Sequence, residues 1–383
     1  MQKKDLSLYI HIPFCIRKCG YCDFLSAAST PEERAYYVRV LQKEIRAFEP
    51  LYNIYRVKTV FFGGGTPSVL EIRHFSRLME QIRESFDIDE NAEITVECNP
   101  GTVNEEKLKC YRTLGINRLS FGLQSADEKE LSLLGRIHSF DDFRTNYTLS
   151  RRLGFDNINV DLMSGIPTQT IKSWENTLKK TVELAPDHIS AYSLIIEENT
   201  PFYEKYTEPA GRRLLPDEET EREMYRLTKA LLGENGYERY EISNYALAGR
   251  ECRHNMVYWT MGSYLGMGPG ASSYIEGKRF SNPRDMQSYR DYVRVAYSTY
   301  KSCEPQSKKA SMEEFMFLGL RMSRGVSVSE FERTFGESFK ELFGGVTDRL
   351  IETNYLSLHE GRLSLTDKGI DVSNRVLANY LLP

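Results

Sequence analysis

The sequence predicts an α/β fold, and two observations support this prediction. Short runs of apolar and β-branched residues alternate with helical patterns through the first two thirds of the chain. Chemically unusual residues come directly after these runs, as they do at the carboxyl ends of parallel strands. The chain has 383 residues, more than one compact domain of ordinary size. The alternation is typical of either an open doubly wound sheet or a closed or partly closed barrel.

The composition is that of a globular protein, with 40% hydrophobic and 27% charged residues. The 50 basic residues nearly balance the 54 acidic ones, so we expect no nucleic-acid partner. No apolar run approaches the ~20 residues that a membrane span needs. Residues 1–5 lead into a strand-like segment instead of the apolar core of a signal peptide. These features predict a cytoplasmic protein.

Six strands are expected, and their mixed apolar and β-branched content suits a mostly buried parallel sheet. In chain order they are residues 6–12, 59–62, 94–97, 118–122, 158–161 and 188–193.

Local capping signals predict where the intervening helices begin. Thr30, Pro31 and Glu33 form the pattern of a capping box, from which a helix is expected to run to about residue 48. Similar signals at residues 68–71 and 139–142 predict two further helix starts.

The last third of the sequence changes character. A charged amphipathic helix is expected at 216–237, followed by a loop-rich aromatic stretch at 240–274 and a linker near 304–309. Beyond the linker, helices are expected at 312–322, 328–335 and 338–353, with a hairpin at 356–365. This order resembles a small winged-helix-like module. The predicted division is 1–215 for the main α/β unit, 216–303 for a segment associated with it, and 304–383 for the C-terminal domain.

Three of the seven cysteines, Cys15, Cys19 and Cys22, form a C-x3-C-x2-C pattern. An odd count without a secretory signal argues against a disulfide framework. Three thiolates on a tight loop can hold three irons of a [4Fe–4S] cluster and leave the fourth iron open to a small molecule. A structural zinc site needs four protein ligands, and no second cysteine pair exists. His11 could supply a fourth ligand, but we expect its side chain to point away from the loop.

The run at residues 9–14, followed by the cysteine loop with Tyr21, resembles the radical S-adenosylmethionine (SAM) proteins. The resemblance is to the branch that contains oxygen-independent coproporphyrinogen III oxidase and the HemW heme chaperones, and it covers essentially the whole chain. It implies a partial (β/α)6 TIM-like barrel, a [4Fe–4S] cluster on Cys15, Cys19 and Cys22, and SAM as a second cofactor.

The resemblance also implies the residues that bind SAM. Residues 63–68 resemble the GGGTP element that receives the SAM amino group, and Glu97 resembles a carboxylate that binds the SAM ribose or amine. In the oxidase, the counterparts of Gln124, Arg136 and Asp161 contact a second SAM molecule. Asp161 lies between apolar neighbours, so a partner for its carboxylate is expected. The full set of implied SAM residues is Tyr9, Tyr21, Gly64, Gly65, Thr66, Glu97, Gln124, Arg136 and Asp161.

Three features favour the chaperones over the oxidase. The oxidase has a fourth cysteine where this chain has Phe24, and it has an N-terminal extension before its cluster, whereas Cys15 comes early here. Residues 254–259 resemble the HNxxYW motif of the heme chaperones. A neutral imidazole of His254 can ligate heme iron, and Tyr258 and Trp259 offer flat aromatic faces for the porphyrin.

These features predict a heme chaperone that carries SAM and a [4Fe–4S] cluster and delivers heme to acceptor proteins. The alternatives are an oxidase that converts coproporphyrinogen III to protoporphyrinogen IX, and a radical SAM enzyme that modifies heme. The expected partners are heme or another tetrapyrrole and the acceptor proteins, one of which could bring the chain to a membrane surface. No catalytic residue is assigned, and the remaining cysteines are expected to be buried or idle: Cys98, Cys110, Cys252 and Cys303.

Overall fold

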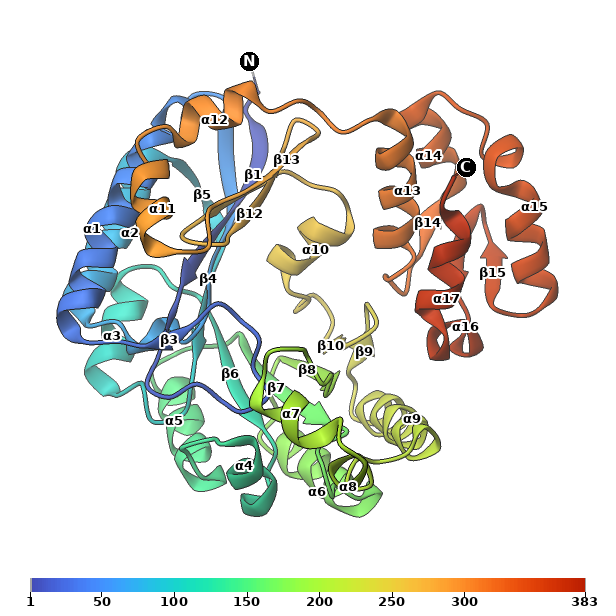
Figure 1. The fold of residues 1–383 in the computed structure, drawn as a ribbon, viewed down its shortest axis with the longest axis horizontal. Coiled ribbons are helices and arrows are strands. Elements are labelled where there is room, and N and C mark those ends of the chain that lie inside the picture. Colours follow the sequence, from blue (N-terminus) through green and yellow to red (C-terminus); the bar gives the residue numbers. More distant parts are fainter. Residues whose placement is uncertain (1, 383) are drawn as a thin grey trace.

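A computed structural model describes residues 2–382 and has an 11-stranded sheet that curves into an open barrel (Figure 1). Seven neighbouring strands are parallel and form the barrel wall. In spatial order they are β11 (Tyr264–Met267), β1 (Lys4–Ile12), β4 (Tyr55–Gly64), β5 (Asp87–Cys98), β6 (Arg118–Gln124), β7 (Ile158–Ser164) and β8 (His188–Ser193). The α/β class and all six predicted strands are confirmed.

The seventh parallel strand, β11, was not predicted. It pairs with β1 and lies inside 240–274, which the sequence predicts to be loop-rich. Only four residues long, it contains Gly266, where a Cβ atom would collide with the backbone of Ser272. Short antiparallel strands then extend both edges of the sheet: β12 (Ser272–Ile275) and β13 (Lys278–Ser281) beyond β11, β10 (Asn244–Ala246) and β9 (Glu238–Arg239) beyond β8.

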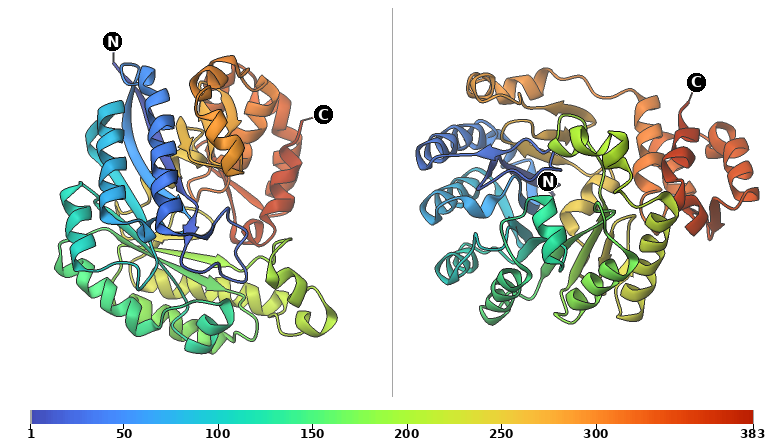
Figure 2. Two further views of the ribbon diagram at one scale, coloured as in Figure 1. Left: turned by 60° about the vertical axis from the view of Figure 1, so that its left-hand side comes forward. Right: turned by 60° about the horizontal axis from the view of Figure 1, so that its bottom comes forward.

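Helices cover the outer face of the barrel, as Figures 1 and 2 show. They include α1 (Pro31–Ala47), α2 (Ile72–Ser85), α3 (Glu105–Thr113), α4 (Glu128–Leu134), α5 (Phe140–Arg152), α6 (Ile171–Val182), α9 (Glu218–Glu234), α11 (Met286–Tyr292) and α12 (Ala296–Ser302). The capping boxes at Thr30 and Ser139 are confirmed. The cap expected at Ser68 is wrong, because α2 begins after Glu71 and the Ser68 hydroxyl bonds to that of Thr102 instead.

The strands alternate between an apolar outer face and a polar inner face. In β6, Leu119, Phe121 and Leu123 are fully buried on the side that the helices cover. Arg118 and Ser120 lie on the opposite face and line a cavity inside the barrel. Side chains on the inner face of several strands can therefore contact a molecule bound inside the barrel.

Helix α10 (Arg253–Trp259) lies in the mouth of the open barrel, with the C-terminal domain beyond it (Figure 1). That domain comprises α13 (Lys308–Gly319), β14 (Val326–Ser327), α14 (Val328–Phe335), α15 (Phe339–Glu352), β15 (Leu356–His359), β16 (Arg362–Leu365), α16 (Asp367–Asp371) and α17 (Ser373–Leu377). Its expected helices and hairpin are confirmed. It has a hydrophobic core of its own, whereas residues 216–303 share the barrel core. The exact domain boundaries stay a prediction. None of the helices described is long and apolar enough to cross a membrane.

Candidate functional site

The cysteine loop follows β1 and the two-residue strand β2 (Phe14–Cys15) at the carboxyl end of the barrel. Cys15, Cys19 and Cys22 are free thiols, and all three line one open cavity of about 700 Å³, here called the cysteine cavity. The loop is fixed by the Gly20 amide, which donates to the carbonyl of Leu134 at 3.3 Å. Within residues 2–382, no group of three or more His, Cys, Asp or Glu side chains could hold a single metal ion. The three thiols instead provide the ligand count of a cluster with one open iron.

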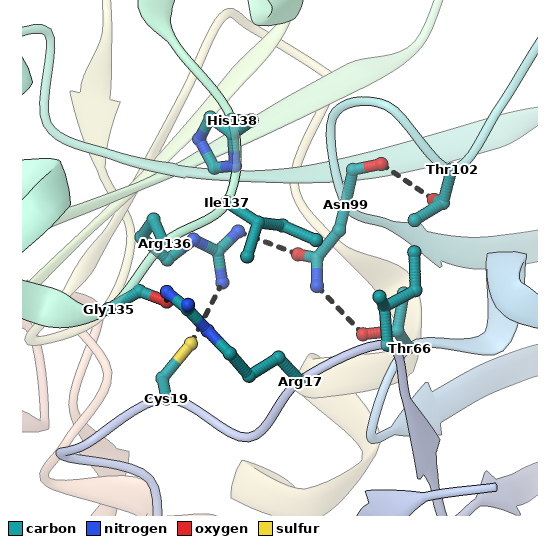
Figure 3. A pocket seen from close by; sticks show the side chains of 10 residues that line it. Arg17, Cys19, Thr66, Asn99, Thr102, Gly135, Arg136, Ile137 and His138 are labelled. Carbon is teal, nitrogen blue, oxygen red and sulfur yellow. Dashed lines mark hydrogen bonds between the residues drawn. The ribbon is translucent and has the colours of Figure 1, made fainter.

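Two of the thiols receive hydrogen bonds from a chain of polar side chains, and Figure 3 shows the part of this chain from Cys19 to Thr66. Arg136 donates to Cys19 Sγ at 3.7 Å and to Asn99 Oδ1 at 2.7 Å. Asn99 in turn donates to the Thr66 hydroxyl at 2.7 Å, and Thr66 donates to Cys15 Sγ at 3.6 Å. Sequence reasoning missed Asn99, although its position just after β5 is a signal that could have found it.

Eight of the nine residues implied for SAM lie around the cysteine cavity. They are Tyr21, Gly64, Gly65, Thr66, Glu97, Gln124, Arg136 and Asp161. These residues from the ends of different strands therefore lie together at one edge of the sheet. Tyr9 is the exception, because it lines a second cavity deeper in the barrel.

The glycines at the end of β4 are required by close packing within the protein. Gly64 has φ of +109°, and a Cβ atom there would lie 2.5 Å from the His11 ring. At Gly65 a Cβ atom would lie 2.6 Å from the Phe14 carbonyl oxygen. The His11 ring itself contacts the Leu25 carbonyl oxygen at 2.9 Å, so this histidine does not face the cysteine cavity.

Glu97 and Asp161 belong to the walls of both cavities. Glu97 accepts a hydrogen bond from the Gly64 amide at 3.2 Å. Burial, and to a smaller extent the nearby charge of Asp161, raises the pKa of Glu97 to about 8. Asp161 accepts hydrogen bonds from Asn159 at 2.8 Å and Ser120 at 3.2 Å, so its expected partners are present. Burial raises the pKa of Asp161 as well.

The second cavity lies inside the barrel and is here called the barrel cavity. Besides Glu97 and Asp161, its lining includes Tyr9, Phe61, Arg118, Tyr192, His254 and Tyr258. Two of the three residues implied for heme, His254 and Tyr258, thus face the barrel interior. Trp259 faces the C-terminal domain instead, where the Arg321 guanidinium lies 4.8 Å from the centre of its ring.

The structure does not present His254 as an open axial ligand. Its side chain is 1% exposed, Nδ1 lies 2.7 Å from the Thr59 hydroxyl and Nε2 lies 2.8 Å from the Tyr258 hydroxyl. Because Thr59 donates its proton to Ser7, Nδ1 of His254 donates to Thr59 and Nε2 accepts from Tyr258. Burial, and then Arg118, lower the pKa of His254 to about 3, which keeps the imidazole neutral.

Comparison with known proteins agrees with this geometry. Residues 9–181 match the Radical SAM superfamily, and residues 306–372 match the HemN C-terminal domain. The solved structure of coproporphyrinogen III oxidase (HemN) from Escherichia coli superposes with a TM-score of 0.84 at 24% identity, over 99% of this chain and 90% of that one. The fold and the cysteine loop define a radical SAM protein.

The sequence relatives place the chain more narrowly. The heme chaperone HemW of Lactococcus lactis is 37% identical over 100% of this chain and 99% of its own length. HemW of Bacillus subtilis is also 37% identical, over 98% of this chain and 99% of its own length. A mitochondrial radical SAM domain-containing protein 1 of Bos taurus is 31% identical over 98% of this chain and 87% of its length. The chain belongs to the HemW family.

Proposed function

We propose that this protein is a cytoplasmic heme chaperone that carries a [4Fe–4S] cluster and SAM and hands heme to acceptor proteins. The observation that carries the proposal is the similarity to heme chaperones named HemW along the entire chain, through both the barrel and the C-terminal domain.

Cys15, Cys19 and Cys22 would hold the cluster. Hydrogen bonds from Thr66 and Arg136 to the sulfur atoms of Cys15 and Cys19 would help to orient these two ligands. When bound, the cluster supplies an open iron for SAM and an electron for its reductive cleavage. The loop contact between Gly20 and Leu134 keeps the cysteines at the mouth of the cavity.

SAM would occupy the cysteine cavity, where two carboxylates face a molecule that carries a positive sulfonium charge. Glu97 and Asp161 are held in place by hydrogen bonds from Gly64, Asn159 and Ser120. These carboxylates would attract the cationic part of SAM. Tyr21, which packs edge-on against Phe202, would close one side of the cavity.

Heme would be bound through His254 only after Tyr258 moves. The lone pair of Nε2 that a heme iron needs is the one that accepts the Tyr258 hydroxyl. A change of the Tyr258 rotamer would free it without breaking the bond between Nδ1 and Thr59, which would orient the ring. Trp259 would pack against the C-terminal domain and would not stack on the porphyrin.

The oxidase is the second candidate, because the fold superposes on HemN over nearly the whole chain. Incubation of anaerobically reconstituted protein with coproporphyrinogen III, SAM and a reductant distinguishes the chaperone function from the oxidase function. The chaperone proposal expects recovery of unchanged coproporphyrinogen, and formation of protoporphyrinogen IX would overturn it.

A further inference from the structure

Arg118, the first residue of β6, is a buried cation inside the barrel. Its side chain is 1% exposed, yet it lines the barrel cavity together with Ser120, Asn159 and Asp161. A guanidinium group in such a place normally has a carboxylate partner, because burial of an unpaired charge is costly.

Among residues 2–382, Arg118 has no such direct partner. No hydrogen bond or ion pair to its guanidinium group is formed, and Nε is buried without an acceptor. The groups whose charges act on it are Cys252, Glu93, Tyr240 and Asp161, and its own charge acts on Glu97, which lines the same cavity.

Each of the three neighbouring carboxylates already accepts a hydrogen bond from another donor, and for Glu97 that donor is the Gly64 amide. Glu93 accepts from the backbone amides of Arg253 at 3.0 Å and His254 at 3.1 Å, which anchors the start of α10. Asp161 accepts from Asn159 and Ser120. The N–H donors of the guanidinium group therefore remain available to a ligand in the barrel cavity.

The rest of the cavity suits an organic acid better than an inorganic anion. Tyr9, Phe61 and Tyr258 contribute aromatic rings to its lining, and Phe61 stacks on His254 with 5.1 Å between ring centres. A flat or extended molecule could pack on these rings while its carboxylate met the planar fork of an arginine.

We propose that Arg118 binds the carboxylate of a ligand that enters the barrel cavity. The inference extends the proposed function, because that function supplies two ligands with such a group. They are heme, through a propionate, and a second SAM molecule in the barrel cavity, through its methionyl carboxylate, in addition to the SAM proposed for the cysteine cavity. The shared chemistry is a paired hydrogen bond between guanidinium and carboxylate, with a loss of at least about tenfold in affinity when the guanidinium is removed.

The test uses the full-length, anaerobically reconstituted protein in three forms: wild type, Arg118→Met and Arg112→Met. Arg112 is an exposed arginine of α3 that lines neither cavity, so it controls for loss of one charge. Each form is titrated with heme and with heme dimethyl ester, in which both propionates are blocked. SAM binding is measured by equilibrium dialysis, and unfolding temperature and iron content are recorded.

If Arg118 binds a heme propionate, Arg118→Met lowers the affinity for heme at least about tenfold. The affinity for the dimethyl ester is then the same in the variant and the wild type. If the group belongs to SAM, heme is unaffected and the variant loses SAM affinity or binds less SAM per chain. Unchanged binding of both ligands by a folded Arg118→Met protein overturns the proposal. A wild-type protein that binds no heme contradicts the chaperone function instead, and the SAM arm then decides the role of Arg118.

Arg118→Lys keeps the assay decisive if Arg118→Met does not fold. Lysine retains the charge but loses the two-pronged donor, so the affected ligand should bind severalfold more weakly. Equal affinities of the lysine variant and the wild type for both ligands would likewise overturn the proposal.

Discussion

The carboxylates of Glu97 and Asp161 form part of the wall that the cysteine cavity and the barrel cavity share. Burial, and secondarily the charge of Asp161, raise the pKa of Glu97 to about 8. A group that changes charge near neutral pH thus lies between the proposed SAM site and the proposed heme site.

SAM affinity should depend on pH through Glu97. The ionised carboxylate binds cationic SAM more tightly than the neutral acid does, so affinity should rise as pH increases from 7 to 9. In Glu97→Gln the affinity should be about tenfold lower at pH 9 and follow only the titration of SAM itself. Equilibrium dialysis across this range checks the prediction, and the same slope in both proteins would refute a role for Glu97.

Substitution of a cysteine in the loop should abolish cluster assembly. Cys15→Ala, Cys19→Ala or Cys22→Ala leaves two thiols, too few for a site-differentiated cube. The matched control is Cys110→Ala, because Cys110 lies on α3 and contacts Ser76 at 3.6 Å, away from the loop. Iron and sulfide analysis after reconstitution should find the cluster in the control and not in the loop variants. A full cluster in Cys19→Ala would contradict the ligand assignment.

Variants of the pair His254 and Tyr258 should act in opposite directions on heme binding. Tyr258→Phe removes the hydroxyl that occupies Nε2, so heme affinity should rise severalfold. His254→Ala should eliminate axial ligation and shift the Soret band. Absorption titration measures both effects. If His254 is only structural, His254→Ala would lower the unfolding temperature and leave the heme spectrum unchanged.

The free energy of unfolding should fall as the pH rises from about 4.5 to 7, because of Glu44 in α1. This fully buried carboxylate accepts hydrogen bonds from the Gly268 amide at 2.8 Å and Asn282 at 2.6 Å, and burial raises its pKa from 4.5 to about 7. The folded protein therefore binds an extra proton between these values, so its stability falls as pH rises through them, by about 3 kcal/mol in total.

Glu44→Gln isolates this contribution from that of Glu97, which has the same sign. The amide cannot ionise, so the difference in unfolding free energy between variant and wild type should shift in favour of the variant from pH 5 to pH 8. Urea unfolding at several pH values measures it. A difference that does not vary with pH would show that Glu44 keeps one protonation state throughout.

The barrel and most of the cysteine cavity could be predicted because each depends on local signals. Strand runs, capping boxes and the strand-end residues Glu97 and Asp161 are contiguous patterns whose neighbours in space follow from parallel pairing. Trp259 and Tyr9 could not be placed, since their surroundings depend on how α10 and the C-terminal domain pack. Arg118 could not be identified because a charged residue at a strand start usually faces solvent, and only the curvature of the sheet into a barrel buries it.

The proposed function requires that the protein bind heme reversibly and leave it chemically intact. The most direct test is a titration of the reconstituted protein with heme in the presence of SAM, followed by transfer to apomyoglobin and mass spectrometry of the recovered pigment. We predict saturable binding of heme, its release to the apoprotein and recovery of unaltered heme. Failure to bind heme, or recovery of a methylated, ring-opened or otherwise modified tetrapyrrole, would contradict it.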